Sequence, residues 1–168
     1  MGGAVTDGAA GEPGREPVPP RETAIAERLD RFFDDLHRID VSCADYARRL
    51  GVADSVMCVL DYLYDHDGAS QRAIREYTML PRQTVNNVIG TLAERGYVRL
   101  VESSQDRRVK SVLFTEEGRR YCNALVAPER AAEYRAMSGL DPALRDAMVR
   151  GMEEFSREFR RRLRETKV

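Results

Sequence analysis

Polar side chains at helical spacing offer the chemistry of base recognition. Arg82, Gln83, Asn86 and Asn87 occupy one face of a predicted helix. Asn is a weaker helix former than the Glu and Lys residues that usually cover a solvated helix face. Side-chain amides and guanidinium groups, however, carry the donors and acceptors that read base edges, with Asn or Gln on adenine and Arg on guanine. Taken alone, the stretch also fits an ordinary amphipathic helix with a polar outer face.

The elements before and after this face predict how it is positioned. Its opposite face carries four aliphatic residues at i, i+3, i+4 and i+7, which predicts an amphipathic helix. They are Val85, Val88, Ile89 and Leu92. A short helix is expected over residues 70–78, with Ala73, Ile74 and Tyr77 inward, and residues 79–81 form a tight connection. Two helices joined in this way predict a helix-turn-helix.

A small hairpin is expected after the second helix. Arg95-Gly96 provides a helix stop. Residues 97–101 alternate like a strand, residues 102–108 form a polar tip, and residues 109–114 return as a second strand. The order helix, turn, helix, strand, basic hairpin, strand predicts a winged helix-turn-helix, so the fold class is mainly α with a small β wing (α+β).

About fifty residues of this region resemble the MarR (multiple antibiotic resistance regulator) family. Residues 106–108 (Asp-Arg-Arg) and 114–118 (Phe-Thr-Glu-Glu-Gly) are similar to its wing signature, Asp-x-Arg followed by Leu-Thr-x-x-Gly, with Phe114 in place of the usual Leu. Residues 83–86 and 92–98 resemble its recognition helix and exit. The resemblance implies a homodimeric regulator of transcription, more commonly a repressor, that binds a palindromic double-stranded DNA site.

The charge distribution agrees with a DNA partner. The chain has a net charge of −1, but residues 70–120 hold ten Lys or Arg against six Asp or Glu, whereas residues 23–69 hold five against ten. Basic charge concentrated on one element favours phosphate contact. The predicted DNA-binding residues are Ser70, Gln71, Arg72, Arg82, Gln83, Thr84, Asn86, Asn87, Arg107, Arg108 and Lys110. Asp106 is expected to orient Arg108 or to cap the wing turn.

Two long helices are expected outside the winged region. Apolar residues from Ile25 to Leu50 follow heptad spacing, which is typical of helices that pack lengthwise against a partner. Asp141-Pro142 begins a last helix with a second apolar stripe. The sequence therefore divides into a disordered tail (1–22), a helical dimerisation lobe (23–51 and 119–168) and a winged helix-turn-helix domain (52–118). The predicted dimerisation residues are Ile25, Leu29, Phe32, Leu36, Phe155, Phe159 and Leu163.

Three local features complete the expected helices. Asp54 or Ser55 can cap the helix that follows the break at residues 51–54. Thr115 is a suitable N-cap for the helix after the wing. Pro128 is expected to kink or interrupt that helix.

Other classes of site find less support. The chain has two histidines and no phosphate-cradling glycine loop or nucleophile elbow, so we expect no enzyme, no cofactor and no catalytic residue. The Asp-His-Asp run at residues 65–67 reads as a polar turn rather than a metal site. A winged helix used for protein contact is the alternative function. No membrane-spanning or signal segment is evident, and a cytoplasmic location without a membrane partner is expected.

The cysteines and tyrosines suggest two forms of regulation. Cys43, Cys58 and Cys122 are expected to be reduced thiols, and a redox-sensing regulator acting through Cys43 is the alternative. By resemblance, a small aromatic or amphipathic effector would bind where the lobes meet. The tentative effector-pocket residues are Tyr46, Tyr62 and Tyr64.

Overall fold

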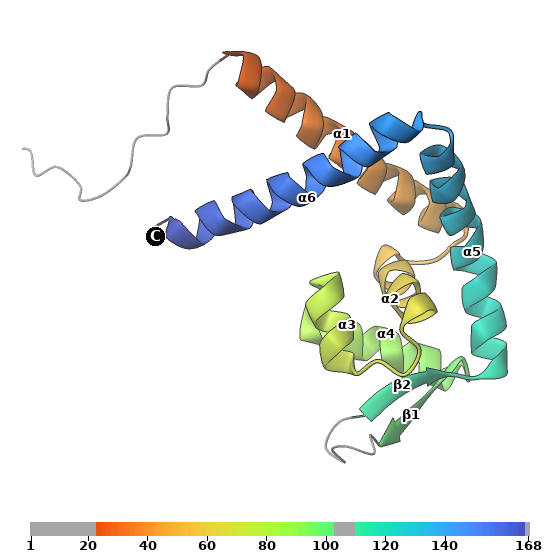
Figure 1. Cartoon of the computed structure of the whole chain (residues 1–168). Coiled ribbons are helices and arrows are strands. Elements are labelled where there is room, and N and C mark those ends of the chain that lie inside the picture. Colours follow the sequence, from red (N-terminus) through yellow and green to blue (C-terminus); the bar gives the residue numbers. More distant parts are fainter. Residues whose placement is uncertain (1–22, 103–109, 167–168) are drawn as a thin grey trace, which may run out of the picture. The chain divides into compact units, whose positions relative to one another are not determined.

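The computed structural model describes residues 23–102 and 110–166 (Figure 1). The chain divides into two compact units, Met1–Asp45 and Tyr46–Val168. The tail predicted over residues 1–22 lies outside the described residues. None of the helices in the described part of the chain has the length and apolar character that a membrane crossing needs.

The first unit contains most of helix α1 (Thr23–Arg49), as the heptad spacing predicts. Several of its apolar side chains are exposed: Ile25 is 60% exposed and Ile39 is also 60% exposed. Phe32 and Leu36 are half-buried. The apolar seam of this helix is therefore incompletely covered within the single chain.

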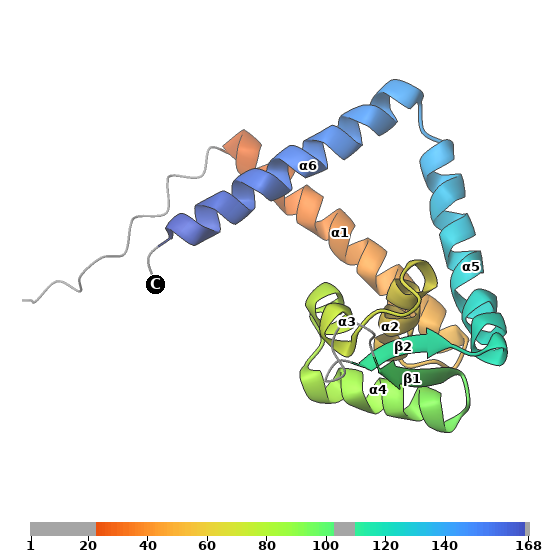
Figure 2. The same ribbon diagram turned by 60° about the horizontal axis from the view of Figure 1, so that its bottom comes forward.

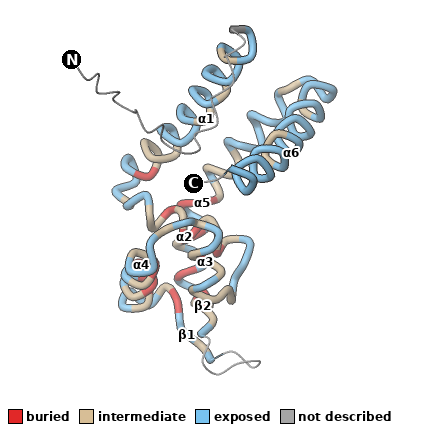
Figure 3. Tube along the Cα trace, turned by 90° about the vertical axis from the view of Figure 1, so that its left-hand side faces the viewer, coloured by how far each residue is buried: buried red, intermediate tan, exposed pale blue. Residues whose placement is uncertain are grey.

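The second unit contains the winged helix-turn-helix, as the sequence predicts. Its helices pack around side chains that are almost fully buried, including Leu60, Ile74, Ile89 and Val112 (Figure 3). The aliphatic stripe predicted for the second helix of the motif forms part of this core. The elements are α2 (Asp54–Asp65), α3 (Gln71–Thr78), α4 (Arg82–Glu94), β1 (Val98–Glu102), β2 (Lys110–Phe114) and α5 (Glu116–Ser138).

The two strands form an antiparallel wing. Val98 pairs with Phe114 at its base and Glu102 with Lys110 at its outer end, so the first strand continues one residue beyond its predicted range. A further bridge joins Ser70 to Ser111. This bridge ties the start of α3 to β2, and Figure 2 shows α3 and α4 beside the sheet.

A side-chain cap and a close backbone contact join α5 to the wing. The Thr115 hydroxyl accepts from the Gly118 amide at 2.9 Å, as expected for the predicted N-cap. A Cβ at Gly118 would lie 1.7 Å from the Tyr97 carbonyl oxygen, so only glycine fits there. The wing and the first turn of α5 therefore pack in direct backbone contact.

Three local predictions are wrong. Ala53 occupies the N-cap position of α2 without a side-chain hydrogen bond, so neither Asp54 nor Ser55 caps that helix. The predicted interruption at Pro128 does not occur, because α5 continues through this residue, and the predicted kink stays a prediction. Tyr77 is 61% exposed rather than inward, and its ring lies 4.6 Å from that of Tyr62.

The last helix differs from those of the winged region. Helix α6 (Pro142–Glu165) begins as predicted, because Oδ1 of Asp141 accepts from the Ala143 amide at 2.9 Å. It has no buried residue, and even its apolar side chains are exposed, Phe159 by 46% and Leu163 by 56%. Its apolar stripe is thus exposed in the single chain, and Figure 3 colours most of α6 as exposed.

Candidate nucleic-acid interface

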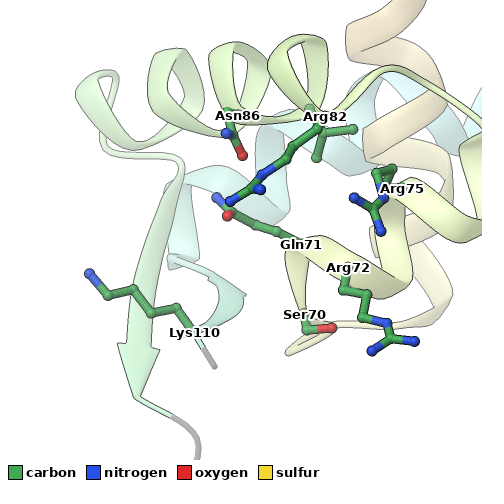
Figure 4. A pocket seen from close by; sticks show the side chains of 8 residues that line it. Ser70, Gln71, Arg72, Arg75, Arg82, Asn86 and Lys110 are labelled. Carbon is green, nitrogen blue, oxygen red and sulfur yellow. The ribbon is translucent and has the colours of Figure 1, made fainter. Parts of the chain in front are cut away.

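A concave groove of about 280 Å³ opens between α3, α4 and β2. Figure 4 shows Arg82 of α4 and Gln71 of α3 pointing toward one another across it, while Arg72 points away. Six predicted DNA-binding residues line this groove, together with two that were not predicted. The lining consists of Ser70, Gln71, Arg72, Arg75, Arg82, Val85, Asn86 and Lys110.

Local structure explains why three separate elements meet here. Ser70 is the N-cap of α3, with its hydroxyl accepting from the Ala73 amide at 3.1 Å. The same residue bridges to Ser111 on β2, which brings neighbouring Lys110 beside the start of α3. Helix α4 begins at Arg82, directly after Pro81, so this guanidinium extends from its first turn. The cap, the bridge and the helix start thus bring basic residues together.

The basic residues of the groove differ in how far their charge is already neutralised. Arg72 forms an ion pair with Glu76, with Nε 2.7 Å from Oε1. Within the described part of the chain, no carboxylate lies at ion-pair distance from Arg75, Arg82 or Lys110. Three cations from three elements, none paired with a carboxylate among residues 23–102 and 110–166, therefore line one concavity, which favours an anionic partner.

The remaining predicted residues of α4 lie outside the groove. Gln83 and Asn87 are exposed, and Nε2 of Gln83 donates to Oδ1 of Asn87 at 2.8 Å. Thr84 is half-buried beside them. The helix consequently offers two polar surfaces: one that lines the concave groove and one that faces outward.

Arg75 lines the groove although the sequence analysis did not predict it. Arg75 lies one helical turn after Arg72, so its place on the same short basic helix was a usable signal. Val85 reaches the groove although it belongs to the core. Asp106, Arg107 and Arg108 lie outside the described residues, so their predicted wing contacts stay predictions.

The Asp-His-Asp run after α2 is used in structural contacts. Oδ1 of Asp67 accepts from the Phe114 amide at 2.9 Å, and its other oxygen pairs with Arg119. Asp65 pairs with Arg130 at 3.2 Å. The His66 ring stacks on Tyr62, with centroids 4.5 Å apart. No metal-binding group of three His, Cys, Asp or Glu occurs among residues 23–102 and 110–166.

The three tyrosines suggested for an effector pocket have separate environments. The Tyr46 hydroxyl donates to the Leu125 carbonyl at 2.9 Å. Tyr62 lies in the aromatic contacts with His66 and Tyr77. Tyr64 is partly buried against the core. None of them lines the groove described above, and their effector role stays a prediction.

Burial makes two of the cysteines poor candidates for reactive thiolates. Cys122 is buried, its Sγ lies 3.5 Å from the Leu60 carbonyl oxygen, and burial raises its pKa to about 12. Burial, followed by the nearby charges of Asp54 and Asp61, raises the pKa of Cys58. A raised pKa keeps a thiol protonated and unreactive. Cys43 is half-buried, and its proposed redox role stays untested.

Comparison of the sequence with known proteins gives matches over part of the chain, in the winged region. The MarR family model matches residues 50–109. The transcriptional activatory protein BadR of Rhodopseudomonas palustris is 32% identical over 73 residues, which is 44% of this chain and 42% of that protein. The chain thus matches less than half the length of this curated relative.

Solved structures share the fold over most of the chain. A MarR family regulator from Neisseria meningitidis superposes with a TM-score of 0.69 at 22% identity, covering 83% of this chain and 99% of that one. Streptococcus pneumoniae FabT in complex with DNA superposes with a TM-score of 0.59 at 19% identity, covering 82% of this chain and 96% of that one. The S. aureus MepR–DNA complex superposes with a TM-score of 0.60 at 20% identity, covering 80% of this chain and 97% of that one.

Proposed function

We propose that this protein is a transcriptional regulator that binds double-stranded DNA sequence-specifically, because the MarR family model matches residues 50–109. The family is one of regulators rather than enzymes, in agreement with the prediction that the chain is not an enzyme. The proposal assigns DNA binding to the winged helix-turn-helix domain (52–118). It assigns dimerisation to the helices of residues 23–51 and 119–168.

The groove between α3, α4 and β2 is the observation that carries this proposal. Duplex DNA presents its phosphates as ridges and its base edges at the floor of a groove. A concave basic surface suits the ridge, and Arg75, Arg82 and Lys110 supply cations that no carboxylate in the described chain neutralises. The convex outer face of α4, with Gln83 and Asn87, suits the major groove.

Exposed apolar side chains on α6 support the proposed homodimer. This helix buries no residue within the chain although Leu144, Phe159 and Leu163 are 57%, 46% and 56% exposed. Covering such a stripe with a second copy removes apolar surface from water. Two symmetry-related recognition helices would then read the two halves of a palindromic operator.

The sign of regulation is part of the proposal. Repression follows the family resemblance, whereas one relative, BadR, is named an activatory protein. Regulation by a small aromatic or amphipathic effector and a cytoplasmic location are proposed on the same basis. A reporter fused to the operator decides the sign: deletion of the regulator should raise expression, and a fall would make the protein an activator.

Fluorescence anisotropy tests DNA binding directly. The full-length protein is titrated against the DNA immediately upstream of its own gene and against a scrambled duplex, across a salt series. We expect a preference of about a thousandfold with a steep salt dependence. Equally weak binding to both duplexes at every salt concentration would contradict regulation of its own gene. No binding to any duplex, including a randomised pool, would favour the protein-contact alternative.

Arginine variants test the groove. Arg75→Ala and Arg82→Ala should each weaken binding to specific and scrambled DNA alike. Each should also reduce the slope of log K against log salt by about 0.9 for every phosphate that the variant no longer neutralises. Arg150→Ala, an exposed arginine of α6, changes the charge equally and serves as the matched control. An unchanged salt slope in Arg75→Ala would remove this residue from the interface.

A charge on α6 tests the homodimer. Phe159→Asp places a carboxylate in the exposed apolar stripe and should shift the protein from dimer to monomer in sedimentation velocity. Glu154→Gln, on the same helix, should leave the sedimentation coefficient unchanged. A wild-type protein that sediments as a monomer at micromolar concentration would contradict the proposed assembly.

A further inference from the structure

Two amides on the outer face of α4 are joined to each other. Nε2 of Gln83 donates to Oδ1 of Asn87 at 2.8 Å, across one helical turn. Both side chains are exposed, and neither lines the basic groove. Within the described chain, neither side chain has another hydrogen-bond partner. The two amides therefore form an isolated pair on the surface proposed to enter the major groove.

The hydrogen bond leaves the pair with a defined set of free groups. A side-chain amide has a carbonyl oxygen that accepts and an NH₂ that donates. The bond engages one N–H of Gln83 and the oxygen of Asn87. Oε1 of Gln83 remains a free acceptor, and Nδ2 of Asn87 remains a free donor. Nε2 of Gln83 also keeps its second N–H, so the pair presents one carbonyl oxygen outside the bond beside free N–H groups. Reversing the direction of the bond would exchange these roles between the two residues.

We propose that Gln83 and Asn87 act as one reading unit that selects an A·T base pair. In the major groove, adenine presents the N6 donor beside the N7 acceptor, whereas guanine presents two acceptors, O6 and N7. The carbonyl oxygen of the pair accepts from N6, and its NH₂ donates to N7. Guanine would place its O6 acceptor opposite that carbonyl oxygen, and two acceptors cannot form a hydrogen bond with each other. The inference rests on the proposed function, because it requires α4 to lie in the major groove.

Joining the two side chains has an energetic consequence. Each long side chain held by the other loses less conformational freedom when it meets a base. Removing either amide frees the other and destroys the arrangement. The two substitutions should therefore be strongly non-additive, as expected for groups within one hydrogen-bond network.

A selection experiment followed by a double-mutant cycle tests this unit. Duplexes that bind full-length wild-type protein are first selected from a randomised library. Affinity is then measured for wild type, Gln83→Ala, Asn87→Ala and the double variant on the selected duplex, on copies with each A·T pair changed to G·C, and on a scrambled duplex. Alanine at these exposed helix positions favours the helix, so the variants should fold. Asn123→Ala removes an exposed amide of α5 and is the matched control.

We expect the wild type to prefer A·T at one position of each half-site by about tenfold or more. Each single variant should lose most of this preference, and the double variant should lose no more than either. Binding to the scrambled duplex and the behaviour of Asn123→Ala should not change.

Three results would overturn the inference alone: losses that multiply in the double variant, single variants that act at different positions, or a wild-type preference that both variants keep. A wild type that selects no sequence would overturn the proposed function and this inference together.

Discussion

Helices α4 and α6 use their apolar residues in opposite ways. The 13-residue α4 buries Val85, Val88, Ile89 and Leu92 inside the winged domain, whereas the 24-residue α6 buries none. The core of the same chain thus satisfies the apolar face of α4, which leaves its polar face free for a ligand. The apolar face of α6 lacks such a core. Under the proposed function, α4 contributes a surface for recognition and α6 a surface for assembly.

The largest expected difference is in the free energy of unfolding after side-chain truncation. Ile89→Ala removes a side chain that is 0% exposed and should cost about 2–5 kcal/mol. Leu163→Ala truncates a side chain that is 56% exposed and should cost less than about 0.5 kcal/mol within its own chain. Urea unfolding at several protein concentrations measures both. A loss in Leu163→Ala that grows with protein concentration would locate its effect in the dimer. If Ile89→Ala and Leu163→Ala lowered the free energy of unfolding equally at every concentration, the contrast between α4 and α6 would be wrong.

A second contrast lies between two glycines. Gly118→Ala would place a Cβ 1.7 Å from the Tyr97 carbonyl oxygen, and the forced backbone shift should cost about 1–3 kcal/mol or more. Gly90→Ala on α4 is the control, because beyond its chain neighbours and its own helix backbone no atom lies within 4 Å of the new Cβ. Replacing glycine in a helix interior should stabilise the protein by about 0.5–1 kcal/mol. Thermal unfolding measures both, and a neutral Gly118→Ala would refute the close contact.

Arg130 provides a smaller, pH-dependent test of the contact between α2 and α5. Its guanidinium lies 2.9 Å from Asp61, whose pKa is raised by burial and lowered by Arg130. Arg130→Met should raise the pKa of Asp61 further and cost about 1 kcal/mol at neutral pH, where the half-buried carboxylate loses its partner.

The sign of this effect follows from the raised pKa. When the pH falls below the pKa that Asp61 has in the folded variant, its carboxyl becomes neutral and the penalty disappears. Urea unfolding of wild type and variant across acidic and neutral pH measures the difference. Arg120→Met removes an exposed pair with Glu116 and should cost only about 0.3–0.5 kcal/mol. A loss in Arg130→Met that is constant with pH would exclude Asp61 as its cause.

The smallest expected effect is at the turn of the helix-turn-helix. Met79 has φ of 55° and is 83% exposed, so it occupies a left-handed conformation that glycine adopts at lower cost. Met79→Gly should raise the free energy of unfolding by up to about 1 kcal/mol. Gly51→Ala is the reciprocal change, at φ of 67°, and should lower it by a similar amount. A destabilised Met79→Gly would show that this side chain makes contacts that outweigh the strain.

Predictions from local sequence patterns were confirmed where the residues that form the pattern lie within one helix or next to it. The stripe from Val85 to Leu92 specifies both faces of α4 because helix periodicity relates residues that are near in sequence. Thr115 and Asp141 bond to amides within three residues, so their caps are also local. Pro128 does not interrupt α5, because the preceding Leu125 and Val126 pack in the core despite the missing donor.

Local sequence patterns did not predict which residues line the groove or how the exposed side chains beside it pair. Arg75 was missed although it lies one turn after Arg72 on the same helix, and only the packing of α3 against α4 and β2 places it in the groove. Tyr77 was placed inward by periodicity, yet tertiary packing leaves it 61% exposed against Tyr62. Gln83 and Asn87 were both predicted to bind DNA, but the hydrogen bond between them emerged only with their rotamers.

The sequence by itself determined the order of the elements, the apolar and polar faces of α4, and the stripes of the two long helices. Each of these depends on a period or a short motif along one segment. Tertiary structure alone decided which cations converge. The Ser70–Ser111 bridge and the packing of α3 against α4 bring Arg75, Arg82 and Lys110 around one groove. Contacts between segments far apart in the chain leave no period in the sequence, because they depend on how separate elements pack.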